Sequence, residues 1–235
     1  MLTAPTAAPA RQAMLDAVVD RIARLAGGLR IAIDGVDGVG KTRLADEIAE
    51  RLDATGRPLI RASADGFHNT RSIRYRRGRD SPEGFYRDSY DLAALREHLL
   101  DPLGPDGTRR FRRHVFDVQR NVPDLAPLKE APPDAVLLLD GMFLHRPELR
   151  GCWDMSVFLH APFVISVPRG AARGPGYGSP DLAAPTNRRY IEGQRLYLRE
   201  CDPFALATLV IDNSDIDHPR ILNHPHHEQS SITSP

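Results

Sequence analysis

The stretch Gly35-Val36-Asp37-Gly38-Val39-Gly40-Lys41-Thr42 decides the fold, because it satisfies every fixed position of the pattern GxxxxGK[ST]. In this pattern, glycines let successive backbone amides turn inward onto phosphate oxygens. The lysine supplies a mobile positive charge between the β- and γ-phosphates, and the threonine hydroxyl can join the shell of a Mg²⁺ ion. We therefore expect a P-loop whose ATP-binding residues are Gly35, Asp37, Gly38, Val39, Gly40, Lys41, Thr42 and Arg43.

Apolar runs and helical patterns extend from this motif in both directions. The run 29–33 precedes it as a strand, and a helical pattern over 41–52 follows it. Further runs predict strands at 58–62, 135–139, 155–159 and 207–211, and apolar spacing predicts helices at 11–25 and 187–198. Near-continuous apolar strands that alternate with helices indicate a parallel sheet covered on both faces. We predict an α/β fold with a doubly wound parallel sheet of the P-loop NTPase (nucleoside/nucleotide kinase-like) type.

The domain organisation follows from length and local composition. Residues 1–10 are rich in Ala, Thr and Pro and are expected to be a disordered N-terminus. A chain of 235 residues can bury one substantial core, so we expect a single domain over 11–215. Prolines and glycines interrupt the segment at about 168–190, which predicts a short or flexible lid. Residues 216–235, with several histidines, are expected to be a flexible tail.

Two aspartates directly follow predicted strands. Asp140 comes after the run 135–139, where a Walker B carboxylate would face the phosphates and hold Mg²⁺ together with Thr42. Asp65 follows the run 58–62 and would lie beside the γ-phosphate, where it could accept the proton of an acceptor hydroxyl. A strand-ending turn at Asp140 and a helix or turn cap at Asp65 are the alternative interpretations.

A P-loop by itself is compatible with GTPases, transport ATPases, motors and kinases. The guanine-reading NKxD motif is excluded, because Lys129, the second of the two lysines, stands between Leu128 and Glu130. The chain has no LSGGQ-type signature and is too short for a P-loop core with an added mechanical module. The class that remains is a kinase.

Charge and cysteine content limit the partners and the location. Lys+Arg and Asp+Glu both total 31, so no net field favours nucleic acid or an anionic membrane. Cys152 and Cys201 are too few for a disulfide framework, and no apolar run approaches the about eighteen residues of a membrane span. We expect a cytoplasmic protein that binds ATP and a small-molecule acceptor and that binds neither nucleic acid nor a membrane. A homo-oligomer is compatible with the sequence.

Five segments, taken in order, resemble the phosphoribulokinase and uridine kinase family, most closely its bacterial uridine-kinase-like proteins. They are the P-loop, Asp65-Gly66-Phe67-His68, the segment 82–91, Val115-Phe116-Asp117 and Asp140-Gly141-Met142-Phe143. The resemblance covers about residues 29–215, and its most specific part is the P-loop. It implies that Asp65 is the catalytic base. It also implies that Lys41 and the lid arginines Arg169 and Arg173 offset charge during phosphoryl transfer.

The resemblance further implies acceptor contacts from Asp65, Phe67, His68, Asp88 and Phe116. The predicted helix 187–198 packs towards the site, so Arg188, Arg189 and Arg195 could also touch phosphate or acceptor. The chain departs from the family at two of these places. Val118 replaces a second base-contacting aromatic, and Tyr86 occupies the strict position of the ribose-binding aspartate that we assign to Asp88. Core positions for Phe67 and Phe116, and solvent-facing positions for the arginines of helix 187–198, are the alternatives.

Because of two arginine clusters, the sequence does not decide whether the acceptor is neutral or anionic. The clusters comprise Arg71, Arg74, Arg76, Arg77 and Arg79, and then Arg109, Arg110, Arg112 and Arg113. Arginines that border the acceptor pocket would favour an anionic acceptor, because guanidinium binds such groups through paired hydrogen bonds. The alternative is a solvated basic face.

We predict a phosphotransferase that moves the γ-phosphoryl group of ATP, with Mg²⁺, to an alcohol group of a nucleoside, foremost the 5′-hydroxyl of uridine or cytidine. One alternative is a kinase for an anionic acceptor such as a sugar phosphate or a modified nucleoside. The other is a non-catalytic ATP-binding regulatory module.

Overall fold

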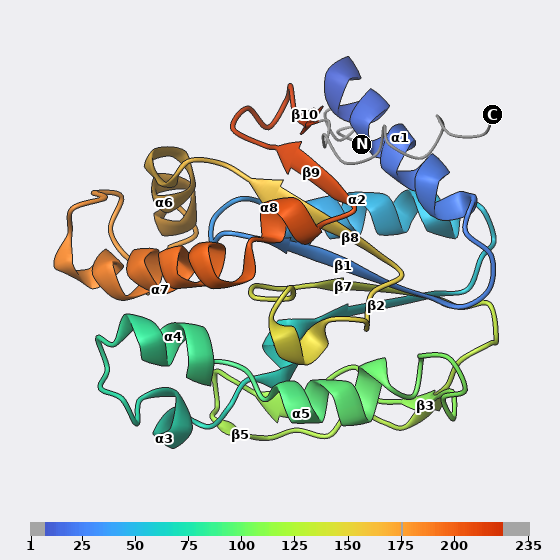
Figure 1. The fold of residues 1–235 in the computed structure, drawn as a ribbon, viewed down its shortest axis with the longest axis horizontal. Helices are drawn as coiled ribbons and strands as arrows, with labels where there is room; N and C mark the ends of the chain where they lie inside the picture. Colours follow the sequence, from blue (N-terminus) through green and yellow to red (C-terminus); the bar gives the residue numbers. More distant parts are fainter. Residues whose placement is uncertain (1–7, 175, 223–235) are drawn as a thin grey trace, which may run out of the picture.

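A computed structural model describes residues 8–174 and 176–222 of the chain (Figure 1). Its central sheet has six strands in the spatial order β10-β9-β8-β1-β7-β2. These strands are β1 (Leu29–Gly35), β2 (Leu59–Ser63), β7 (Val136–Asp140), β8 (Met155–His160), β9 (Leu209–Asp212) and β10 (Arg220–Leu222). Every neighbouring pair is parallel except β9 and β10. The parallel strands therefore end at one common edge, which is where a doubly wound sheet binds ligands.

Helices cover both faces of this sheet. On one face, α1 (Pro9–Ala23) and α2 (Lys41–Asp53) pack their apolar residues with Ile31 and Ile33 of β1. On the other face, α4 (Pro82–Asp88), α5 (Leu92–Leu95) and α7 (Pro185–Cys201) pack around a cluster that contains Ala32. Neighbouring residues of β1 belong to different cores because successive side chains of a strand point to opposite faces.

The remaining elements are short. The helices are η1 (Ala64–Phe67), α3 (Arg71–Arg74), η2 (Arg96–Leu100), η3 (Pro147–Leu149), α6 (Phe163–Ala171) and α8 (Pro203–Leu206). Two antiparallel pairs, β3 (Arg110–Phe111) with β6 (Lys129–Glu130) and β4 (Phe116–Asp117) with β5 (Val122–Pro123), lie in the long connection from β2 to β7. No helix within residues 8–174 or 176–222 combines the length and the apolar character that a bilayer span requires.

The predicted doubly wound α/β fold is confirmed, and each predicted strand corresponds to a parallel strand of the sheet. Both expected chain ends need correction. Pro9 and Ala10 already belong to α1, and residues 1–7 lie outside the described residues. At the other end, residues 220–222 of the expected tail form β10, which pairs antiparallel with β9, and residues 223–235 lie outside the described residues. A strand of three residues was too short to give a periodic signal.

The segment expected to form a lid is made of several pieces. It contains the end of α6, which includes Pro168, then a connection to α7, and then the start of α7. Within the described part of that connection, residues 172–174 and 176–184, there is no helix or strand. Gly174, Gly176 and Gly178 have φ values of 125°, 98° and 88° there. The positive φ angles therefore exclude a continuous helix across this segment, whereas Pro168 is accommodated inside α6, and movement of the segment stays a prediction.

The buried carboxylate of Asp34 ties the base of the P-loop to the rest of the fold. Its Oδ1 accepts a hydrogen bond from the backbone N–H of Gly35 (2.7 Å), and its Oδ2 accepts one from the N–H of Leu144 (3.2 Å). The hydroxyl of Tyr197 also donates to Oδ2, and Nδ1 of His145 lies 2.7 Å from it. Burial raises the pKa of Tyr197 well above its ordinary value, and the charge of Asp34 adds to this, so the hydroxyl remains a donor.

We expect Tyr197→Phe to lower the free energy of unfolding by about 1–3 kcal/mol, because it removes a donor from a buried carboxylate and an acceptor from the N–H of His145. Urea unfolding followed by circular dichroism measures this change. The matched control is Tyr177→Phe, whose side chain is 52% exposed and should change stability by less than about 0.5 kcal/mol. Equal unfolding midpoints for the two variants would contradict the role given to the Asp34 network.

Candidate active site

The P-loop occupies residues 36–40, between β1 and α2. Gly38 and Gly40 have φ values of 72° and 98°, which side-chain-bearing residues rarely adopt. A Cβ atom at Gly38 would lie 2.0 Å from the carbonyl oxygen of Ser166 in α6. Gly40 is the N-cap of α2 and provides no side-chain cap, so the amides of the first turn stay open to a bound anion.

Lys41 folds back over this loop. Its Nζ donates a hydrogen bond to the carbonyl oxygen of Val36 (2.9 Å). Burial lowers the pKa of Lys41, while the carboxylates of Asp37, Asp34 and Asp140 oppose the shift. A carbonyl is a neutral acceptor that a phosphate oxygen can replace, so the ammonium group is placed as the P-loop chemistry requires.

Thr42 and Asp140 form the candidate metal site. Thr42 Oγ1 donates to Asp140 Oδ2 (2.7 Å), and the Asp140 carboxylate is almost fully buried. Hydroxyl and carboxylate oxygens are the ligands that Mg²⁺ prefers, and such an ion takes its other ligands from phosphates and water. The described residues contain no cluster of three or more acidic, histidine or cysteine side chains that could hold a metal without such help. The donor set therefore fits Mg²⁺ bound together with a nucleotide.

Arg61 of β2 is an unexpected neighbour of this site. Its guanidinium nitrogen NH1 lies 2.6 Å from Asp140 Oδ1, and its Nε lies 2.9 Å from Asp46 Oδ1. The positive charge of Arg61 thus occupies one oxygen of the carboxylate that would bind Mg²⁺. A cation beside a metal ligand weakens the binding of another cation.

Asp65 lies in η1, directly after β2, and its side chain is 66% exposed. Its Oδ1 accepts a hydrogen bond from the hydroxyl of Tyr90 (3.0 Å). Burial raises the pKa of Tyr90 well above its ordinary value and the charge of Asp65 contributes, so Tyr90 remains a donor. A carboxylate that is held on one oxygen and exposed on the other can accept a proton from a bound ligand.

These groups share one cavity of about 60 Å³ at the carboxyl edge of the sheet. It is lined by Asp37, Lys41, Thr42, Ser63, Asp65, Tyr90, Asp140, Gly141, Met142 and Arg173. We refer to it as the crevice. The guanidinium of Arg173 lies 3.4 Å from the carboxylate of Asp37, which places a mobile positive charge in the crevice wall. The structure therefore brings together the expected lysine, base, metal ligands and one of the two expected lid arginines.

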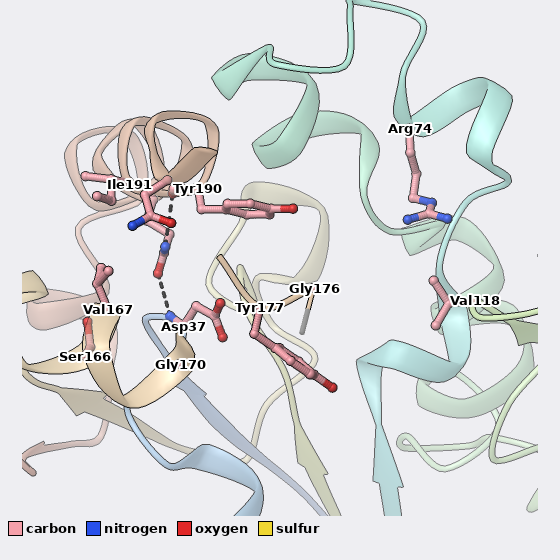
Figure 2. A pocket seen from close by; sticks show the side chains of 12 residues that line it. Asp37, Arg74, Val118, Ser166, Val167, Gly170, Gly176, Tyr177, Tyr190 and Ile191 are labelled. Carbon is pink, nitrogen blue, oxygen red and sulfur yellow. Dashed lines mark hydrogen bonds between the residues drawn. The ribbon is translucent and has the colours of Figure 1, made fainter. Parts of the chain in front are cut away.

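A second cavity of about 350 Å³ adjoins the crevice through Asp37 (Figure 2). Its wall includes Arg74 and Val118 from the connection between β2 and β7, and Tyr190 from α7. Figure 2 shows the ring of Tyr190 projecting into the space between Asp37 and Arg74. A cavity of this size next to a P-loop is a candidate site for a small acceptor.

Arg169, the other expected lid arginine, points elsewhere. Its guanidinium donates to the carbonyl oxygens of Asn213 (2.7 Å) and Ser214, just beyond β9. It is not among the residues that line the crevice. In this conformation Arg169 fastens α6 to the end of β9, and its catalytic role stays a prediction.

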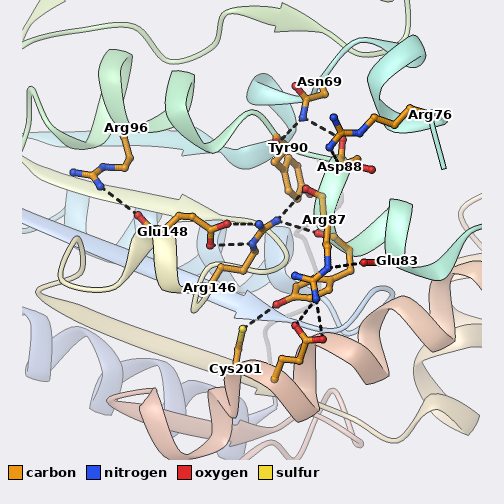
Figure 3. A network of polar contacts seen from close by, with 12 residues as sticks. Asn69, Arg76, Glu83, Arg87, Asp88, Tyr90, Arg96, Arg146, Glu148 and Cys201 are labelled. Carbon is orange, nitrogen blue, oxygen red and sulfur yellow. Dashed lines mark hydrogen bonds and ion pairs between the residues drawn. The ribbon is translucent and has the colours of Figure 1, made fainter.

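Two of the expected acceptor contacts lie in the interior. Phe67 is 0% exposed and belongs to the hydrophobic core. Asp88 is 2% exposed, and its carboxylate is bound by Arg76 (2.5 Å), as Figure 3 shows, and by Arg77 (2.9 Å). Burial favours the neutral acid, but the hydrogen bonds and charges of the two arginines outweigh this and lower the pKa of Asp88. We therefore correct both assignments: Phe67 packs the core, and Asp88 binds two neighbouring arginines.

Two aromatic candidates lie nearer the site. The ring of His68 packs against Tyr90 with 4.6 Å between ring centroids, and its Nδ1 lies 2.9 Å from the carbonyl oxygen of Asp65. Burial lowers the pKa of His68, which favours the neutral ring. Phe116 and Val118 line an open cleft of about 520 Å³ that also contains Asp65. Contacts from His68 and Phe116 to an acceptor stay predictions.

The exposed arginine candidates face solvent. Arg188 and Arg195 are exposed on α7, and Arg195 pairs with Glu192 (2.7 Å). Arg43 is exposed on the first turn of α2 and pairs with Glu47 (3.0 Å). Arg188 and Arg195 thus match the solvent-facing alternative for the helix arginines, whereas Arg189 of the same helix is buried.

Two residues that sequence reasoning missed hold the P-loop from outside. Gln194 of α7 accepts a hydrogen bond from the backbone N–H of Asp37 (2.5 Å), and Asn213 donates to the carbonyl oxygen of Val39 (2.7 Å). Asn213 directly follows the parallel strand β9. Its position at the end of a predicted strand was a signal that its side chain lies at the same edge of the sheet as the P-loop. Gln194 lies within a helix that was predicted correctly, and its spacing carried no comparable signal.

Comparisons with solved structures identify the fold. A possible uridine kinase from Bacillus stearothermophilus matches with a TM-score of 0.67 and 21% identity, over 85% of this chain and 97% of the other. A candidate fructose transport system kinase from Silicibacter matches with a TM-score of 0.62 and 24% identity, over 80% and 94%. D-glycerate 3-kinase from Cryptococcus neoformans matches with a TM-score of 0.55 and 14% identity, over 86% and 95%. No family model and no curated protein sequence matches the chain. The chain therefore has the fold of these P-loop proteins.

We expect Arg61→Gln to tighten Mg²⁺ binding in the presence of ADP by about 3- to 10-fold, because it removes a positive charge beside Asp140. Titration of Mg²⁺ into the ADP-bound protein by calorimetry measures the change. Arg57→Gln is the matched control, since Arg57 donates to the backbone carbonyl oxygens of Asp134 and Leu25 rather than to Asp140. Weaker Mg²⁺ binding by Arg61→Gln would instead mean that Arg61 orients the carboxylate.

Proposed function

We propose that the protein is an ATP-dependent kinase that transfers the γ-phosphoryl group to an alcohol hydroxyl of a small acceptor. The observation that carries the proposal is the position of Asp65 in the crevice that also contains Lys41, Thr42 and Asp140. A module that only binds ATP needs a lysine and a metal site, but it has no use for an exposed carboxylate beside them. Likeness in fold to a possible uridine kinase and to D-glycerate 3-kinase supports the same proposal. We also propose the cytoplasm as its location.

In the proposed reaction, the acceptor oxygen attacks the γ-phosphorus while the bond from that phosphorus to the bridging oxygen of ADP breaks. Asp65 accepts the proton of the attacking hydroxyl, and Tyr90 keeps the carboxylate oriented. Lys41 and Arg173 offset the negative charge on the transferring group. A Mg²⁺ ion bound by Thr42 and Asp140 would supply further positive charge at the phosphate oxygens.

Two classes of acceptor are compatible with this site. A nucleoside, foremost uridine or cytidine, is supported by the sequence resemblance and by likeness to a possible uridine kinase. An anionic acceptor such as a sugar phosphate is supported by the arginines near the second cavity. Release of ADP from Mg-ATP, measured against nucleosides, nucleotides, sugar phosphates and pantothenate, tests the kinase, with Lys41→Ala as the inactive control. If none of these acceptors stimulates the release of ADP, the regulatory ATP-binding module is favoured.

We expect Asp65→Asn to lower the rate of phosphoryl transfer in single turnover by about 10²- to 10⁴-fold, because the amide cannot accept the hydroxyl proton. Binding of Mg-ATP should change little, since Asp65 makes no contact with the P-loop among the hydrogen bonds of the described residues. Asp53→Asn, at the exposed end of α2, is the matched control and should retain the full rate. Normal turnover by folded Asp65→Asn protein would remove Asp65 as the base.

A further inference from the structure

Three guanidinium groups surround the ring of Tyr75. The Cζ atoms of Arg74, Arg79 and Arg189 lie 5.6, 5.5 and 4.8 Å from the centroid of this ring. Among the described residues, none of the three arginines has a carboxylate within ion-pair distance, whereas the neighbouring Arg76 pairs with Asp88 and Arg77 pairs with Asp88 and Glu83. The face of an aromatic ring attracts cations, but it carries no net charge. The cluster therefore holds positive charge that the described chain leaves uncompensated.

Arg189 has an unused hydrogen-bond donor. It is only 8% exposed, and its NH1 donates to the carbonyl oxygen of Arg79. Its Nε is buried and has no hydrogen-bond partner within the described residues. Buried polar groups in native proteins are nearly always hydrogen-bonded, so Arg189 carries a donor that the described residues do not satisfy.

Arg74 adds a second desolvated cation. Its Nε donates to the carbonyl oxygen of Asn69 (3.0 Å), and its other nitrogens have no acidic partner among the described residues. Burial lowers the pKa of Arg74, and the like charges of Arg71 and Arg189 lower it further. An anion bound between Arg74 and Arg189 would relieve this repulsion.

The cluster is connected to the crevice through adjoining cavities. A cleft of about 540 Å³ is lined by Tyr75, Arg79 and Arg189, and it shares Gly176 and Tyr190 with the cavity of about 350 Å³ that Arg74 lines. That cavity in turn shares Asp37 with the crevice (Figure 2). Asp80 also lines the cleft, but it is exposed and forms no ion pair with a described arginine. The arginine cluster, the cavity of about 350 Å³ and the crevice are therefore neighbours in the structure.

We propose that the acceptor carries an anionic group, a phosphate or a carboxylate, that binds between Arg74, Arg79 and Arg189. This inference rests on the proposed kinase function, and it selects the anionic class of acceptor over a neutral nucleoside. Guanidinium groups bind both kinds of anion through paired, charge-assisted hydrogen bonds. A neutral nucleoside would provide no negative charge to balance the cluster, and the Nε of Arg189 would remain without a charged partner.

The first test measures anion binding without turnover. The full chain, labelled with ¹⁵N-arginine and saturated with Mg-ADP so that the P-loop is filled, is titrated with inorganic phosphate and, separately, with acetate, with chloride at equal ionic strength as the reference. We expect a saturable shift of the Nε–H signal of Arg189, identified by its loss in Arg189→Gln. Saturation by phosphate assigns a phosphorylated acceptor, and saturation by acetate assigns a carboxylated one. Shifts no larger than those with chloride overturn the inference.

Variants then separate binding from folding. Arg189→Gln should weaken binding of the saturating anion by at least about tenfold, because a charge-assisted pair is lost. Arg79 is exposed, so Arg79→Gln should fold normally and weaken the same binding by a smaller factor even if Arg189→Gln does not fold. Arg199→Gln, at an exposed position of α7 away from the cleft, is the matched control and should bind the anion as the unaltered protein does.

The acceptor panel separates failure of this inference from failure of the proposed function. The unaltered protein should transfer phosphate faster to a charged acceptor than to its uncharged counterpart, for example faster to ribose 5-phosphate than to ribose, and this transfer should require Lys41. Loss of that preference in Arg189→Gln supports the inference. If the unaltered protein and Arg189→Gln phosphorylate neutral nucleosides at equal rates, the inference is wrong, but the proposed kinase function is supported. Saturable anion binding without any Lys41-dependent ADP release overturns the kinase and, with it, the identification of the anion as an acceptor.

Discussion

The rest of the site depends on the buried carboxylate of Asp34. It accepts hydrogen bonds from the first amide of the P-loop, from the loop after β7 and from Tyr197 of α7. A buried charge is tolerated only where such donors surround it, so these partners must be in place together. The direction in which the chain leaves β1, and hence the path of the glycines that follow, is fixed by this requirement.

The sheet topology supplies the other half of the site. The ends of β1, β2 and β7 are neighbours because β7 pairs with both β1 and β2. Lys41 and Asp65 follow the ends of β1 and β2 by a few residues, and Asp140 is the last residue of β7, which is why groups far apart in the sequence line the same cavity. Thr42 and Arg61 then share the two oxygens of Asp140, one as a neutral donor and the other as a cation.

Sequence reasoning was reliable where function depends on position along a strand or within a motif. The parallel strands, the P-loop and the two aspartates after strands could be predicted because apolar runs and glycine spacing are local signals. Asp88 and Phe67 could not be assigned this way, since their burial depends on Arg76, Arg77 and a core assembled from distant segments. Gln194 could not be found for the same reason, because its partner Asp37 lies more than a hundred residues away, and the sequence did not distinguish the buried Arg189 from the exposed arginines of the same helix.

Helix α7 contacts both the base of the P-loop and the cleft that contains the arginine cluster. Tyr197 reaches Asp34, Gln194 reaches the N–H of Asp37, and Arg189 lines the cleft beside Tyr75. A ligand in the cleft that displaced α7 would therefore also disturb these two contacts with the P-loop, and thermodynamic linkage would then make a bound nucleotide change the affinity for that ligand by the same factor.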